Sequence, residues 1–125
     1  MKIGFIGLGI MGKPMAKNLL KAGYTDLMVN NHSQAAVQEL QAAGATGATQ
    51  QEIGAQCDVV ITMLPNSPQV KEVMLGDNGV AAHMKPGAVF IDCSSINPVA
   101  SKEIYAELQN KGVEMLDAPV SGGEP

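Results

Sequence analysis

Three glycines near the N-terminus have a spacing that suits phosphate binding. Gly7, Gly9 and Gly12 follow the pattern G-x-G-x-x-G, after the apolar segment 2–7 and before a segment with helical spacing. In such a turn the first glycine permits the bend, the second lets the backbone approach a pyrophosphate, and the third lets helix and strand pack closely. The N–H groups at the start of the helix and its positive dipole end attract phosphates. The motif predicts a bound dinucleotide, and a turn without any ligand is the alternative.

The residues expected to reach the adenosine ribose lie about 20 residues further on. An acidic residue at the end of the second strand binds the 2′-hydroxyl in NAD sites, but positions 30–33 read Asn-Asn-His-Ser here. Without a carboxylate a 2′-phosphate is not repelled, and Asn31, His32 or Ser33 can donate hydrogen bonds to it, although no arginine is present to clamp it. The cofactor is therefore NAD or NADP, with NADP favoured. Alternatively, Asn31 and Ser33 only shape the turn and cap the next helix.

Three further strand ends carry groups that could contact ligands. Ligands of parallel α/β sheets bind beyond the carboxyl ends of the strands. Residues 63–66 offer backbone and apolar surface, and residues 92–95 bring hydroxyl groups towards the nicotinamide ribose. Residues 117–123 include a Ser-Gly-Gly turn that can form an anion-binding nest for a carboxylate. Ordinary turn formation and helix capping are the alternative for each segment taken alone.

The elements that must position these groups alternate regularly along the chain. Short apolar runs predict strands at 2–7, 27–29, 59–64, 88–92 and 113–116. Helical spacing begins at Met11 and ends at Gly23, and four further helices are expected after the N-caps Ser33, Thr49, Ser67 and Asn97. Ser67 and Asn97 are each followed by a proline suited to the first helical position. Residues 45–48 and 80–84 fit no single element.

This alternation defines the expected fold class. Strands that are apolar throughout are typical of burial on both faces, which requires helices on both sides of a parallel sheet. The class is α/β, a Rossmann-type, doubly wound, mainly parallel sheet. With 125 residues, the chain is long enough for one compact domain spanning 1–125.

Composition excludes several other classes of function. Hydrophobic residues make up 46% of the chain, the formal net charge is −4, and there is no basic run, so neither nucleic acid nor a membrane is expected as a partner. No segment reads as a membrane span or a signal peptide. Cys57 and Cys93 are isolated, which predicts buried thiols in a reducing cytoplasm and no metal site.

Four ordered segments resemble the β-hydroxyacid dehydrogenases, the family that includes 3-hydroxyisobutyrate dehydrogenase. They read GFIGLGIMGKPMAKNLLKAG, ITMLPNSPQV, IDCSSINP and LDAPVSGGEP, and within the family they look most similar to tartronate semialdehyde reductases. The resemblance covers nearly the whole chain. It implies that Leu8, Ile10 and Met11 line the cofactor site with the glycines, that Leu64, Pro65 and Ser95 contact the cofactor, and that a substrate carboxylate is held by Ser121, Gly122 and Gly123. Similar enzymes interconvert a small 3-hydroxy acid and its semialdehyde using NAD(H) or NADP(H).

The sequence departs from this family in two places. Asn31 and His32 replace the acidic residue of NAD-preferring members, and the family's catalytic lysine, in a G-x-x-x-K-x-x-N context, would lie beyond Pro125. No catalytic residue is therefore expected within the chain, since neither His83 nor Asp117 is a convincing proton donor.

We accordingly expect the cofactor-binding part of a longer, homo-oligomeric enzyme, lacking the helical domain for catalysis and dimerisation and inactive alone. A non-catalytic dinucleotide-binding module for sensing or protein assembly is the alternative. A related reductase that acts on a larger acid is a third possibility.

Overall fold

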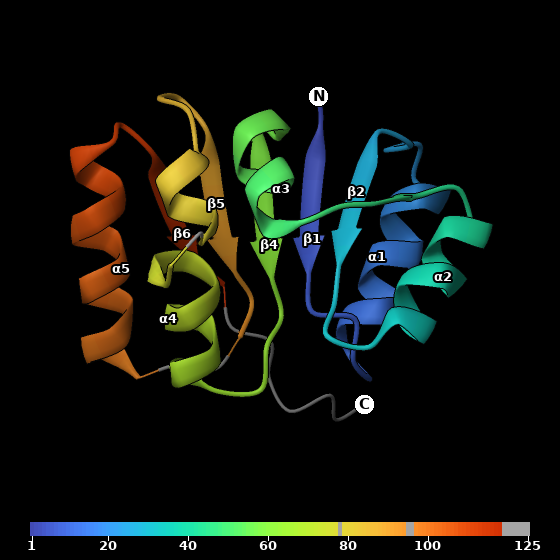
Figure 1. The fold of residues 1–125 in the computed structure, drawn as a ribbon, viewed down its shortest axis with the longest axis horizontal. Helices are drawn as coiled ribbons and strands as arrows, with labels where there is room; N and C mark the ends of the chain where they lie inside the picture. Colours follow the sequence, from blue (N-terminus) through green and yellow to red (C-terminus); the bar gives the residue numbers. More distant parts are fainter. Residues whose placement is uncertain (78, 95–96, 119–125) are drawn as a thin grey trace.

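The apolar segments form a parallel sheet with the N-terminal strand near its centre (Figure 1). The computed structural model describes residues 1–77, 79–94 and 97–118, and within these residues the sheet is 6-stranded, in the order β3-β2-β1-β4-β5-β6. The strands are β1 (Ile3–Ile6), β2 (Leu27–Asn30), β3 (Thr46–Gly47), β4 (Val59–Thr62), β5 (Val89–Asp92) and β6 (Glu114–Asp117). Each neighbouring pair runs parallel, which confirms the predicted Rossmann-type α/β class.

The order of the strands reverses beside β1. The chain first moves outward from β1 to β2 and β3, and then returns to β4 on the other side of β1. Ile3 pairs with Leu27 on one side and with Val59 on the other. This reversal leaves a crevice at the carboxyl ends of β1 and β4, where ligands of such sheets bind.

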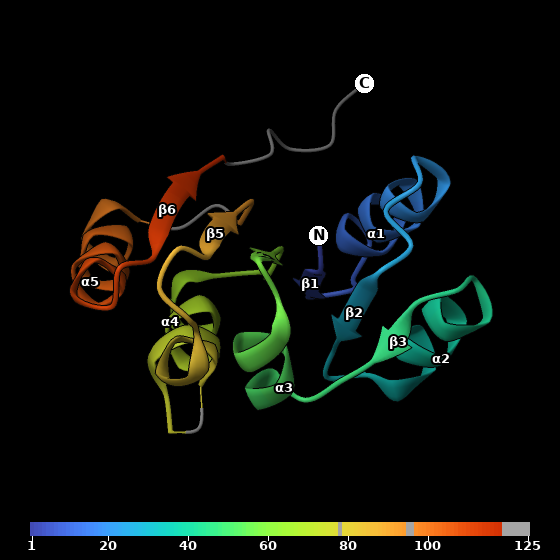
Figure 2. The same ribbon diagram turned by 90° about the horizontal axis from the view of Figure 1, so that it is seen from above.

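Helices cover the two faces of the sheet unequally (Figure 2). The helices α1 (Gly12–Lys21) and α2 (Gln34–Ala42) lie over β1–β3 on one face. The other face is covered by α3 (Gln50–Gln56), α4 (Ser67–Leu75), a short 3-10 helix (Val80–His83) and α5 (Pro98–Asn110). None of the helices formed by the described residues has the length and apolar character needed to cross a bilayer.

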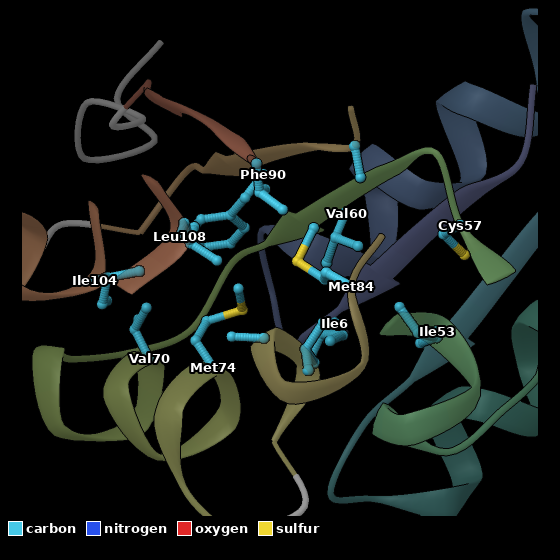
Figure 3. Close-up of a cluster of buried hydrophobic side chains, with 14 of the residues drawn as sticks. Ile6, Ile53, Cys57, Val60, Val70, Met74, Met84, Phe90, Ile104 and Leu108 are labelled. Atoms are coloured by element: carbon cyan, nitrogen blue, oxygen red, sulfur yellow. The ribbon is translucent and has the colours of Figure 1, made fainter. Parts of the chain in front are cut away.

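The larger core lies beneath α3, α4 and α5. Figure 3 shows that it is built from alternate residues of the strands, such as Ile6, Val60 and Phe90, and from the inner faces of the helices. Met74 and Leu108 are completely buried within it. A second cluster, which includes Phe5, fills the space beneath α1 and α2.

The expectation that every strand is buried on both faces is wrong for β4–β6. One row of side chains crosses the sheet from Phe5 through Ile61 and Ile91 to Leu116. Phe5 is 0% exposed, the two isoleucines are half-buried, and Leu116 is 55% exposed. Exposure rises along this row because α1 and α2 cover the other half of the sheet.

Helix caps agree with the sequence at three positions and differ at one. Thr49 and Glu52 form the predicted capping box, Asn97 caps α5, and Ser33 precedes α2, although its side chain makes no capping bond. The prediction that Ser67 caps α4 is wrong, because Asn66 takes this role and its Oδ1 accepts from the Gln69 N–H at 3.1 Å. Ser67 is instead the first helical residue.

Two ambiguous segments and one strand end are now defined. Residues 45–48 contain the short edge strand β3, and residues 80–84 contain the 3-10 helix. The strand predicted over 59–64 ends at Thr62, so Met63 and Leu64 belong to the loop that follows it. This shorter strand places both residues at the carboxyl edge of the sheet.

We expect Leu108→Ala to lower the free energy of unfolding by about 2–5 kcal/mol, because the side chain is 0% exposed and its loss leaves a cavity. Leu116→Ala removes the same atoms from a side chain that is 55% exposed, so its effect should be about 0.5 kcal/mol or less. Urea denaturation of the two variants measures the difference. Equal losses would contradict the placement of the core beneath α3–α5.

Candidate cofactor site

The glycine turn is held together by close backbone contacts. Gly7 has φ +102°, which few other residues adopt, and a Cβ there would overlap the carbonyl oxygen of Met63. A Cβ at Gly12 would overlap the carbonyl oxygen of Gly7. These contacts bring β1, the start of α1 and the end of β4 together with no side chain between them. The first and third glycines therefore have the roles predicted for them.

Gly9 differs, because no contact among the described residues requires a glycine there. None of their heavy atoms lies within 4 Å of the position that its Cβ would occupy, and its φ is not in the left-handed region. The neighbouring Ile10 is 92% exposed. An open backbone cradle beside an exposed isoleucine at the start of α1 fits a pyrophosphate, which needs close access to helix N–H groups. The residues present thus fit the predicted dinucleotide.

A cavity of about 870 Å³ opens beside this turn. It collects most of the residues predicted to bind the cofactor from three separate segments: Gly7, Gly9, Ile10, Met11, Gly12, Asn31, His32, Leu64 and Pro65. The carboxyl ends of β1, β2 and β4 bring these residues together at one edge of the sheet. The predicted residues Ser95, Ser121, Gly122 and Gly123 lie outside the described residues.

Leu8 and Asn31 take positions that the sequence did not suggest. The Leu8 side chain is 3% exposed within the core beneath α1 and is not among the residues lining the cavity. Its N–H donates to Asn31 Oδ1 at 2.9 Å, and Asn31 Nδ2 donates to the Ser33 carbonyl at 3.2 Å. Asn31 therefore fixes the glycine turn from the end of β2. The sequence had predicted only that Asn31 contacts the cofactor ribose or shapes the turn in which it lies.

The described part of the cavity has little charge. Glu72 is the one acidic residue among the described residues that line it, and no lysine is among them. The end of β2 contributes Asn30, Asn31 and His32, so no carboxylate lies where one would bind a ribose 2′-hydroxyl.

Five lining residues were missed by sequence reasoning. They come from the end of β1, the start of α3 and the length of α4, and are Ile6, Gln50, Gln69, Glu72 and Val73. On α4, the last three have the helical spacing that puts them on one side, which is a usable signal. Gln50 carries no comparable signal, because only the packing of α3 against β1 and β2 brings it to the cavity.

The end of β5 was expected to bring hydroxyl groups to the site, but the polar residues described there are buried. Asp92 and Ser94 are both 0% exposed and are not among the residues lining the cavity. Burial raises the pKa of the Asp92 carboxyl, and hydrogen bonds from Ser94 and Thr62 partly oppose this effect. Burial also raises the pKa of the neighbouring Cys93 thiol, so that it is a poor nucleophile.

A glycine turn that opens a helix, set at the reversal point of a parallel sheet beside a cavity, defines a Rossmann-type dinucleotide-binding domain. The family model described as the NAD binding domain of 6-phosphogluconate dehydrogenase matches residues 2–125. The chain belongs to this family, and its relatives are dehydrogenases of the 3-hydroxyisobutyrate dehydrogenase type.

Three relatives show the extent of the similarity. The NAD-dependent L-serine dehydrogenase of Pseudomonas aeruginosa is 50% identical over 123 residues, and 2-hydroxy-3-oxopropionate reductase of Escherichia coli is 41% identical over 124 residues. The matches cover 98% and 99% of this chain, but 41% and 42% of those proteins. The structure of Mycobacterium tuberculosis 3-hydroxyisobutyrate dehydrogenase with L-serine has a TM-score of 0.87 at 37% identity, covering 98% of this chain and 41% of that one.

These findings confirm the predicted family resemblance. The 2-hydroxy-3-oxopropionate reductase is a relative as expected, but the Pseudomonas enzyme is more similar, at 50% against 41% identity. The chain spans about two-fifths of the length of these relatives (41% and 42%).

We expect Gly9→Ala to fold like the wild-type chain but to bind NADH about tenfold or more weakly, because the added methyl group enters the space needed by a pyrophosphate. Calorimetric titration with NADH measures binding, and urea denaturation measures stability. Gly12→Ala is the matched control, since its methyl group meets the Gly7 carbonyl and should destabilise the fold itself. Unchanged NADH binding by a stable Gly9→Ala chain would refute the placement of the phosphates.

Proposed function

We propose that this chain is the cofactor-binding part of an NAD(P)-dependent oxidoreductase that interconverts a small 3-hydroxy acid and its semialdehyde. The main observation behind this proposal is the cavity that is lined by the glycine turn and by the ends of β2 and β4. Family membership supports the dinucleotide, and the names of the relatives support an oxidoreductase of hydroxy acids. The tartronate semialdehyde and glycerate pair is the specific substrate type proposed.

The chain's own residues would hold the cofactor along this edge of the sheet. The amides that follow Gly9 receive the pyrophosphate, Ile10 and Met11 cover it, and Leu64 and Pro65 form the opposite wall. When bound, the cofactor supplies or accepts the hydride. Ser95 is proposed to contact it as well, and Ser121, Gly122 and Gly123 are proposed to bind the substrate carboxylate in a backbone nest. Holding both molecules in register is itself a large part of catalysis.

The proton donor for the carbonyl oxygen is proposed to lie outside these 125 residues. Lysine is absent from the described lining of the cavity, and most of the lysines are engaged elsewhere. Lys2 pairs with Asp26, Lys13 and Lys17 pair with Glu39, Lys71 pairs with Glu103, and Lys85 pairs with Asp58. We therefore propose a longer, homo-oligomeric, cytoplasmic enzyme in which this domain is followed by a helical catalytic and dimerisation domain.

The choice between the two cofactors is proposed to rest on the end of β2. Asn31, His32 and Ser33 offer hydrogen-bond donors and no negative charge, which favours NADP over NAD. The side-chain oxygen of Asn31 already accepts from the Leu8 N–H, and one hydrogen of Nδ2 is donated to the Ser33 carbonyl. The second hydrogen of Nδ2 is the donor that remains for a ligand.

We expect the wild-type chain to bind both NADH and NADPH in calorimetric titrations, with NADPH binding more tightly. Asn31→Asp keeps an oxygen for the Leu8 N–H but adds a negative charge, so it should shift the ratio of the two affinities towards NADH by about tenfold. Asn31→Ala removes the bond to Leu8 without adding charge and should weaken both cofactors, NADPH the more, because the Nδ2 donor is lost as well. A ratio that Asn31→Asp leaves unchanged would count against this position as the selector, and failure to bind either cofactor would overturn the proposed function.

The chain alone should show no steady-state oxidation of NADH or NADPH with tartronate semialdehyde, because no proton donor is proposed within it. The absorbance at 340 nm measures this directly, and calorimetric binding of the cofactor to the same sample is the control. Measurable turnover that is abolished by Ser121→Ala would show that the chain contains its own proton donor.

A further inference from the structure

A buried hydrogen-bonded cluster joins the ends of β4 and β5. Asp92 Oδ1 accepts from Thr62 Oγ1 at 2.9 Å and from the Ser94 N–H at 3.0 Å. Ser94 Oγ in turn accepts from the Leu64 N–H at 2.7 Å. Asp92, Ser94 and Thr62 are all 0% exposed. The cluster therefore runs from the interior of the sheet to the loop that follows β4.

Stability alone does not account for an aspartate at this place. Among the described residues, Asp92 Oδ2 has no hydrogen-bond partner although the atom is buried. Burying a carboxyl costs folding free energy, and an apolar residue of similar size would usually cost less. The groups that gain from the aspartate are the donors it accepts from, above all the Ser94 N–H.

The Ser94 hydroxyl acts on the wall of the cofactor cavity. It accepts a hydrogen bond from the N–H of Leu64, and Leu64 lines that cavity together with Met63 and Pro65. Met63 and Leu64 are also the residues that a Cβ at Gly7 would meet, so the same loop packs directly against the glycine turn. A shift of this loop would therefore move the turn.

We propose that Asp92 and Ser94 are positioning residues for the cofactor, which act through the Leu64 N–H to fix the 63–65 wall against the glycine turn. This inference rests on the proposed cofactor site. Asp92 orients Ser94 through its N–H, and Ser94 holds the loop through its hydroxyl. Asn31 performs the corresponding task on the other side, where it holds the Leu8 N–H. The turn is thus clamped from β2 by one side chain and from β5 by two.

The test uses the 125-residue chain and NADH as the probe. Ser94→Ala should raise the Kd for NADH about fivefold to tenfold, the effect of losing one such hydrogen bond, and should move the Leu64 amide resonance in a ¹H–¹⁵N NMR spectrum. Asp92→Ala should act in the same direction. Asp92→Asn keeps an oxygen for the Ser94 N–H and should restore most of the affinity.

Thr62→Val is the matched control. It removes a buried hydrogen bond to the same Asp92 oxygen but leaves the link from Ser94 to Leu64 in place. Its Kd for NADH should stay within about twofold of the wild-type value, and its Leu64 amide resonance should stay close to the wild-type position. This should hold even if urea denaturation shows that Thr62→Val loses as much stability as Ser94→Ala.

The outcomes separate the two claims. If the wild-type chain binds no NADH, the proposed function fails. If it binds but Ser94→Ala binds equally well, or if the Kd follows stability alike in Ser94→Ala and Thr62→Val, the positioning role is wrong. Should Asp92→Ala not fold, Ser94→Ala and Asp92→Asn still decide the question.

Discussion

A direct approach of backbone to backbone at the centre of the sheet is the constraint on which this structure depends. Gly7 lies against the Met63 carbonyl and Gly12 lies against the Gly7 carbonyl, so the first strand, the first helix and the fourth strand meet without side chains between them. This contact lets α1 begin at the sheet edge, where its N–H groups can serve a ligand. Gly9, in contrast, has no neighbour among the described residues that a side chain would disturb, and the open space beside it suits a phosphate.

Local sequence signals predicted most of the fold because each element carries its own boundaries. The capping box at Thr49 and the N-cap at Asn97 appear as predicted, and the apolar runs become strands in one parallel sheet. The cap of α4 was misassigned because Asn66 and Ser67 are both good N-cap residues, and only the backbone geometry decides between them. Burial at Leu116 was overestimated because an apolar run does not reveal whether a helix reaches its face.

The candidate site was predictable where a motif carries it and not where distant segments meet. The glycine turn, Leu64 and Pro65 lie together as the motifs suggested. The bond from the Leu8 N–H to Asn31 and the cluster around Asp92 each join residues that are far apart in the sequence, and no local pattern encodes such contacts. Polar residues at strand ends were interpreted as facing a ligand, whereas Asp92 and Ser94 turn inward, and Ser94 bonds to the loop that lines the cavity.

The central place of β1 has a consequence for the order in which the protein folds. β1 leaves the ribosome first, yet its two neighbours are β2 and the much later β4, and the turn after β1 needs Met63 to pack against. Such pairing of distant segments is slow, because a long loop must close before any contact rewards it. The nascent chain must therefore be synthesised past Leu64 before the proposed coenzyme site can form. A dinucleotide bound at this edge would therefore stabilise only states in which the two halves of the sheet have already joined.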